Sequence, residues 1–167
     1  MKLTSLEVFE LHIPFRAAFT HASAERVMTE TVWVKAGSDA GVVGFGEGCP
    51  RVYVTGETLE TAQRFFSKHR AAWLEMEWSF SVLVDWAAGH RAEIDANPAA
   101  WCAVELALLD LIGKAQQQSV EALFGLPELA GKRVYTAVLG ASEPAKFRAQ
   151  LAYYQKAGFR DYKIKLA

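Results

Sequence analysis

Residues 97–112 decide the fold of this chain, and they read Asn97-Pro98-Ala99-Ala100-Trp101-Cys102-Ala103-Val104-Glu105-Leu106-Ala107-Leu108-Leu109-Asp110-Leu111-Ile112. The stretch predicts a helix, because its first residue can serve as a cap and proline suits the first helical position. From Trp101 onwards only Glu105 and Asp110 are polar, so this helix must be buried between other elements. We predict structural roles for both carboxylates, with Asp110 pairing with Lys114 one turn later.

The residues before this helix predict a three-stranded antiparallel sheet. Residues 3–13 alternate between apolar and polar side chains and stop at Pro14, which is typical of a half-buried strand. Two further strands, at 29–35 and 42–48, are joined by a turn at 37–41 and therefore form a hairpin.

The third predicted strand contains Gly44-Phe45-Gly46-Glu47-Gly48, which superficially resembles a phosphate-binding loop. Cys49-Pro50 follows where the helix of such a loop would begin, so we reject an anion site. The glycines are instead expected to permit a bulge or a close approach of another backbone.

Two segments lack a steady period and are predicted to be extended loops with side chains suited to recognition. They are Phe15–Val27 and Pro50–Gly56. For the first segment, an ordinary connection remains an open alternative.

Helices are predicted at residues 57–74, with Thr55 as the cap, and at residues 79–94, since apolar side chains recur there at helical spacing. His69 and His90 lie among polar neighbours in these helices. We therefore expect both histidines at the surface.

The end of the chain predicts a strand at 133–139, a helix capped by Ser142 that runs to about Ala157, and a strand at 160–167. This order and spacing indicate a right-handed parallel crossover unit. Two parallel strands and one helix cannot bury themselves, so we expect the chain to be a truncated part of a longer protein.

The last five residues, Lys163-Ile164-Lys165-Leu166-Ala167, place two ammonium groups on one face of the final strand. In a closed pocket, repulsion and desolvation would let one lysine lose its proton near neutrality and act as a base. Such a base could take a proton next to a carboxylate if a metal ion held the resulting enediolate. The alternative, a solvated strand face, stays open from the tripeptide alone.

Composition excludes several classes of protein. The 167 residues are 51% hydrophobic, which assures a sizeable core, and the formal net charge is −1. Lys and Arg are scattered, so we predict neither a nucleic-acid nor a membrane partner. Two distant cysteines and the absence of a signal-like segment favour a cytoplasmic protein.

Taken together, four motifs resemble the enolase superfamily, in particular its mandelate racemase/muconate lactonizing enzyme branch, which includes dipeptide epimerases. The motifs are Gly44–Pro50, Tyr53–Thr58, Ala103–Lys114 and Lys163–Lys165. The resemblance implies an α+β capping domain at residues 1–130, a three-stranded meander followed by helices. Residues 131–167 would then be the first strand, helix and second strand of an incomplete, modified TIM (β/α) barrel.

The resemblance also implies an activity. The full-length protein would be an isomerase that racemises or epimerises dipeptides or N-acyl amino acids, small-molecule carboxylates, through an enediolate. Lys165 would be the acid/base and Lys163 would assist it, while the two irregular segments would close over the substrate. Phe19, His21, Arg51 and Tyr53 are the substrate-binding candidates.

The family's cofactor is Mg²⁺, and its ligands are expected beyond residue 167, so no metal ligand is assigned within the chain. We expect a homo-oligomer at full length and an inactive chain on its own. A muconate-type cycloisomerase is an alternative that shares Lys165. The non-enzymatic alternative is an inactive capping or interaction module.

Overall fold

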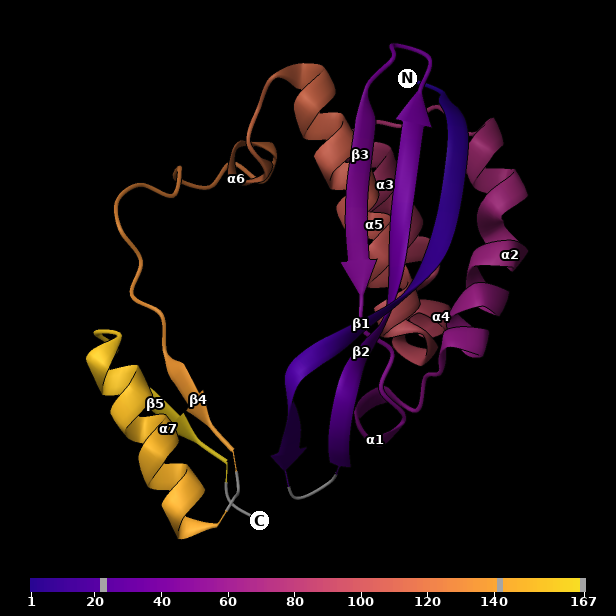
Figure 1. Ribbon diagram of the computed structural model, residues 1–167. Coiled ribbons are helices and arrows are strands. Elements are labelled where there is room, and N and C mark those ends of the chain that lie inside the picture. Colours follow the sequence, from indigo (N-terminus) through magenta and orange to yellow (C-terminus); the bar gives the residue numbers. More distant parts are fainter. Residues whose placement is uncertain (22–23, 141–142, 166–167) are drawn as a thin grey trace. The chain divides into compact units, whose positions relative to one another are not determined.

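The structure is a computed structural model with two compact units, each built from two stretches of chain (Figure 1). The first unit contains residues 1–12 and 30–129, and the second contains residues 13–29 and 130–167. The structure describes residues 1–21, 24–140 and 143–165, and the side chains of residues 17, 19–21, 24 and 25 lie outside this description.

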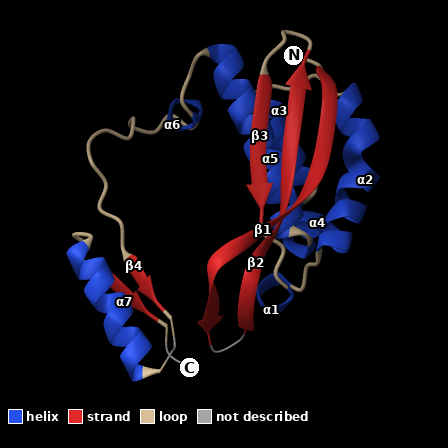
Figure 2. Cartoon of the chain, in the orientation of Figure 1, coloured by secondary structure: helices blue, strands red, loops and turns tan. Residues whose placement is uncertain are grey.

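The predicted three-stranded antiparallel sheet is confirmed. Its strands are β1 (Leu3–His21), β2 (Ala24–Ser38) and β3 (Val43–Gly48), in the spatial order β1-β2-β3 (Figure 2). β2 and β3 run antiparallel, with Val34 opposite Gly46.

The first strand is longer than predicted. It continues through Pro14 to His21, and β2 begins at Ala24, so most of the segment Phe15–Val27 is strand rather than loop. β1 lies at an edge of the sheet. Proline is tolerated in edge strands because its missing N–H need not serve a neighbouring strand.

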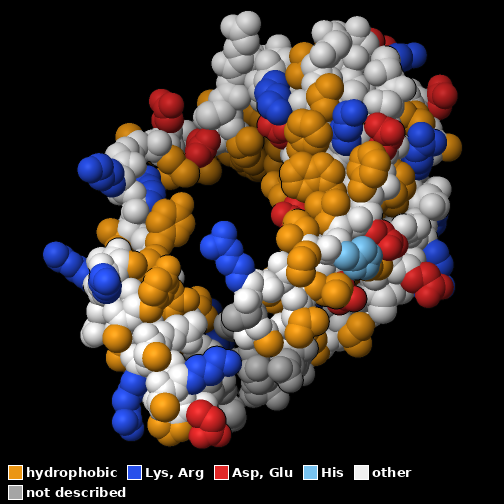
Figure 3. All heavy atoms as spheres, in the orientation of Figure 1, with side chains coloured by type: hydrophobic (Ala, Val, Ile, Leu, Met, Phe, Trp, Pro, Cys, Tyr) orange, Lys and Arg blue, Asp and Glu red, His pale blue; other side chains and the backbone are white. Residues whose placement is uncertain are grey.

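Helices cover one face of this sheet (Figure 1). They are α2 (Leu59–Glu75), α3 (Phe80–Gly89), α4 (Arg91–Ala96) and α5 (Pro98–Gln116); the short α1 (Val52–Thr55) and α6 (Val120–Leu123) lie at connections. The opposite face of the sheet carries apolar and charged side chains together (Figure 3), including a tilted contact between the rings of Trp33 and Phe45 at 5.7 Å.

Two helix boundaries differ from the prediction. α2 is capped by Thr58 rather than Thr55, since the Thr58 hydroxyl accepts the Thr61 N–H at 3.1 Å and the Thr61 hydroxyl accepts the Thr58 N–H at 2.9 Å. The helix predicted at 79–94 is interrupted at His90, which has non-helical angles. Gly89, a weak helix former, immediately precedes the break.

The buried helix is confirmed as α5. Leu108, Leu111 and Ile112 have no exposed surface, and the Nζ of Lys114 lies 2.6 Å from an Asp110 carboxylate oxygen, as predicted. The predicted cap is wrong, because the Asn97 side chain donates to the Glu93 carbonyl and makes no capping bond.

The glycines of β3 allow the close backbone approach that the sequence predicted. A Cβ at Gly44, Gly46 or Gly48 would collide with backbone carbonyl oxygens of α5. These carbonyls belong to Ala107, Ala103 and Ala99, one turn apart. A strand with glycine at every second position therefore packs directly on the helix backbone.

His69 is buried, contrary to expectation. Its side chain lies among aromatic rings, stacked on Trp73 at 5.3 Å, and its Nε2 is 3.0 Å from Oε1 of Glu93. His90 is partly buried and stacks on Trp86 with ring centroids 4.0 Å apart. Each stacking partner lies four residues away along the chain, whereas the contact with Glu93 joins α2 to α4. The polar residues next to the histidines in the sequence did not reveal this burial.

The second unit contains β4 (Ala137–Leu139), α7 (Pro144–Lys156) and β5 (Tyr162–Ile164). β4 and β5 pair in parallel, with Ala137 opposite Tyr162, so the predicted strand–helix–strand order is confirmed. Both strands are shorter than predicted, because only three residues of each pair together. Ser142, the predicted cap, lies outside the described residues. None of the helices in the described part of the chain has the length and hydrophobicity needed to cross a membrane.

Candidate functional site

The two lysines lie at the carboxyl end of β5. Lys163 is inside the strand, and Lys165 follows it and donates its backbone N–H to the Leu139 carbonyl at 2.8 Å. Because β4 and β5 are parallel, their carboxyl ends meet at one edge. Lys163 is exposed and Lys165 is partly buried. Two ammonium groups at one strand end can attract a carboxylate, and a neutral lysine can accept a proton.

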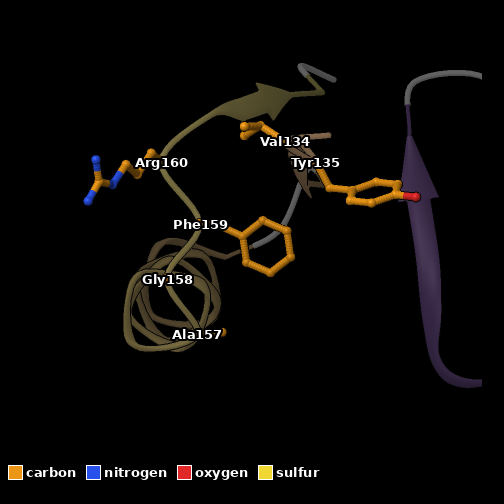
Figure 4. Close-up of a pocket in the computed structure, with 6 residues that line it drawn as sticks. All are labelled: Val134, Tyr135, Ala157, Gly158, Phe159 and Arg160. Carbon is orange, nitrogen blue, oxygen red and sulfur yellow. The ribbon is translucent and has the colours of Figure 1, made fainter. Parts of the chain in front are cut away.

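A hollow of about 450 Å³ lies at the other end of these strands (Figure 4). Val134 and Tyr135 precede β4, and the remaining lining residues, 157–160, connect α7 to β5. The Arg160 side chain extends away from the others (Figure 4). The hollow is therefore at the amino ends of the strands, opposite to the lysines, and it is not part of the candidate site.

Arg51 and Tyr53 lie in the segment Pro50–Gly56, which was predicted to be irregular and contains the single helical turn α1. Nη1 of Arg51 donates to the carbonyls of Glu30, at 2.7 Å, and Pro50, at 2.6 Å. Tyr53 is 45% exposed. The segment therefore has a fixed arginine at its start and an accessible aromatic ring.

Phe19 and His21 are on β1, and their side chains lie outside the described part of the structure. Nearby, the guanidinium of Arg26 is 5.7 Å from the centroid of the Phe15 ring and donates to the Met28 carbonyl at 3.1 Å. These contacts order part of the long hairpin that the sequence had suggested was a loop.

The four predicted site residues whose side chains the structure describes fall into two groups. Lys163 and Lys165 share one strand end in the second unit, and Arg51 and Tyr53 share one helical turn in the first unit.

Three further residues in or next to the segment Pro50–Gly56 were not among the predicted site residues. Val52 and Val54 are 65% and 69% exposed, so α1 presents an apolar surface. Glu57, at the start of the helix predicted at 57–74, is buried. The motif Tyr53–Thr58 contained Val54 and Glu57, but nothing in the sequence showed the burial of Glu57.

The described residues do not provide a metal site by themselves, since they contain no group of three His, Cys, Asp or Glu side chains placed to hold an ion. The two helix carboxylates have structural surroundings. Asp110 accepts the Phe45 N–H at 2.9 Å and pairs with Lys114. Burial raises the pKa of Glu105 above its ordinary value.

Comparisons with known proteins identify relatives of this architecture. A family model for the N-terminal domain of mandelate racemase/muconate lactonizing enzyme matches residues 3–125. The L-Lys-D/L-Arg epimerase of Methylococcus capsulatus is 30% identical over 99% of this chain and 46% of its own length. The N-succinyl-L-Arg/Lys racemase of Bacillus cereus is 24% identical over 99% of this chain and 44% of its own length.

A solved structure shows the same fold. The dipeptide epimerase from Enterococcus faecalis, complexed with Mg and the dipeptide L-Leu-L-Tyr, superposes with a TM-score of 0.79 and 26% identity. The match covers 100% of this chain and 46% of that chain. The chain therefore spans about half the length of the relatives that it matches.

Proposed function

Because the chain belongs to the mandelate racemase/muconate lactonizing enzyme family, through that family's N-terminal domain, we propose that it is the N-terminal part of a racemase or epimerase. The observation that carries the proposal is the position of Lys163 and Lys165 at the carboxyl end of a strand in a parallel β-α-β unit. Active sites of (β/α) barrels lie at this end of the strands.

The reaction we propose is proton removal from the carbon next to a carboxylate. The neutral Nζ of Lys165 takes the proton, the C–H bond breaks, and its electron pair is delocalised into the carboxylate as an enediolate. Lys163 contributes positive charge towards that carboxylate. A protonated group outside this chain then acts as a general acid and donates a proton to the opposite face of the enediolate carbon, which inverts the carbon.

Dipeptides or N-acylated amino acids are the proposed substrates. The names of the relatives support this class, since they are an epimerase of L-Lys-D/L-Arg and a racemase of N-succinyl-L-Arg/Lys. Phe19, His21, Arg51 and Tyr53 are the proposed binding residues. The exposed apolar side chains of α1 suit contact with an apolar part of the substrate.

Magnesium is the proposed cofactor, and the presence of Mg in the similar epimerase structure supports it. Once bound, it would supply positive charge at the substrate carboxylate. The described residues of this chain do not fit a magnesium site, so we place the ligands in the remainder of the protein.

The test is a stereochemical assay of the complete protein with Mg²⁺ and a panel of dipeptides and N-succinyl amino acids, with a muconate assayed beside the panel. We expect inversion at one α-carbon, followed by NMR, and loss of activity when the metal is removed with EDTA. The 167-residue chain alone serves as a control and is expected to be inactive. If the protein converts a muconate but inverts no dipeptide or N-succinyl amino acid, it is a cycloisomerase and the proposal is wrong. Complete inactivity would favour an interaction module.

A further inference from the structure

Glu57 is a buried carboxylate at the junction between α1 and α2. Its side chain is enclosed, with a residue exposure of only 2%. Oε1 and Oε2 accept the N–H of Ala99 at 3.0 and 2.9 Å, and Oε1 also accepts the N–H of Ala100 at 3.1 Å. Glu57 therefore caps α5 from a position 42 residues earlier in the chain.

The first turn of α5 requires such a partner. N–H groups at the start of a helix have no acceptor within the helix, and the helix dipole makes this end positive. The Asn97 side chain does not serve them, because it bonds to Glu93 instead. A buried carboxylate is in turn tolerated only when hydrogen bonds replace its hydration. The carboxylate and the helix end thus depend on each other.

The same carboxylate also holds α1. The hydroxyl of Thr55, the last residue of α1, donates to Oε2 of Glu57 at 2.8 Å. No residue of α1 is buried. Packing in a core therefore does not fix this turn, and the hydrogen bond from Thr55 to Glu57 helps to hold it in place. Gly56, which lies between the two partners, allows the sharp change of direction with a φ of 77°.

We propose that Glu57 is a positioning residue for substrate recognition: it ties the turn that carries Arg51 and Tyr53 to the amino end of α5. This inference rests on the proposed function, in which that turn contacts the substrate. Glu57 is buried beneath the turn and acts through it. Its loss should therefore weaken substrate binding more than it slows proton transfer.

Hydrogen exchange tests the structural part on the chain itself. The variant Glu57→Gln keeps the size of the side chain but leaves only one good acceptor and no charge. We expect exchange to become about tenfold faster for amides of residues 54–56 and of the first turn of α5, with α3 little changed. Glu60→Gln, which removes a charge from the exposed first turn of α2, is the control and should exchange like the wild type. Equal acceleration throughout the chain, or none at residues 54–56, would overturn the inference.

Kinetics of the complete protein test the functional part. Glu57→Gln is expected to raise KM about tenfold while kcat stays within about twofold. Thr55→Val should raise KM in the same direction, whereas Thr55→Ser, which keeps the hydroxyl, should restore it. A fall in kcat with unchanged KM would overturn the positioning role. If the wild type shows no isomerase activity, the proposed function fails, and the exchange comparison still decides whether Glu57 fixes the turn.

Discussion

At the residue scale, Glu93 joins two helices through one carboxylate. Its Oε1 lies 2.5 Å from Nζ of Lys68 and 3.0 Å from Nε2 of His69, both on α2. The hydrogen bond from Lys68, followed by that from His69, lowers the pKa of Glu93 below its ordinary value of 4.5. A carboxyl group with a lowered pKa stabilises the fold above its unfolded pKa, and this stabilisation is lost as the pH falls through the folded pKa.

The variant Glu93→Gln should therefore lower stability in a pH-dependent way. At pH 7 we expect a loss of about 1 kcal/mol or less, since the Glu93 side chain is partly solvated. The difference from the wild type should shrink as the pH falls through the lowered pKa of Glu93, because the wild-type side chain then also becomes uncharged. Urea unfolding at pH 7 and pH 3.5 measures this difference. If the difference in the free energy of unfolding between the two proteins grows at low pH, the charged contacts of Glu93 are not the cause of the lost stability.

Residue roles were predictable where the partners are close in sequence. The pair Asp110–Lys114 follows from helical spacing and is confirmed, whereas the roles of Lys163 and Lys165 stay predictions. His69 was expected at the surface, and the burial of Glu57 was not predicted, because their partners lie 24 and 42 residues further along the chain. Only the packing of α5 and α4 against these residues shows that they are buried.

At the element scale, β3 can pack on the backbone of α5 because the residues of β3 that face the helix are glycines, which have no side chain. In Gly46→Ala, the new methyl group would meet the Ala103 carbonyl and the Ala107 amide, which belong to a helix backbone that cannot move aside. We expect a loss of about 3 kcal/mol in the free energy of unfolding, measured by urea denaturation.

The matched control is Gly89→Ala. A Cβ at this position meets nothing within 4 Å, and the residue ends α3. We therefore expect no loss of stability, or a gain of up to about 1 kcal/mol from the better helix former. Similar losses in both variants would show that the close approach of β3 to α5 is not the cause.

The order of the elements was predictable, and several of their boundaries were not. Alternation and turn residues predicted the sheet, and the apolar run from Trp101 to Ile112 predicted the buried helix. Pro14 suggested a strand end, yet β1 continues because it is an edge strand. Local signals identify a possible break, whereas the position of a strand in its sheet decides whether the break occurs.

At the scale of the whole molecule, the core belongs to the first unit. Its main cluster of buried hydrophobic residues extends from Leu3 to Ile112, and among the described residues after 129 only Ala137 and Leu139 are buried hydrophobics. Removal of residues 130–167 should therefore leave a cooperative unfolding transition, with a free energy of unfolding within about 1 kcal/mol of the original. Urea denaturation followed by tryptophan fluorescence measures this change. Loss of cooperativity would show that the second unit supports the first.

Exchange of the α-proton in D₂O tests whether Lys165 removes a proton from the substrate. In the complete protein with Mg²⁺, the wild type should replace the α-proton of its dipeptide or N-acyl amino acid substrate with deuterium, as followed by NMR. Lys165→Ala should abolish this exchange for the enantiomer whose proton faces Lys165, while Lys156→Ala, at the end of α7, should leave it unchanged. Exchange by Lys165→Ala at the wild-type rate from both enantiomers would contradict the account.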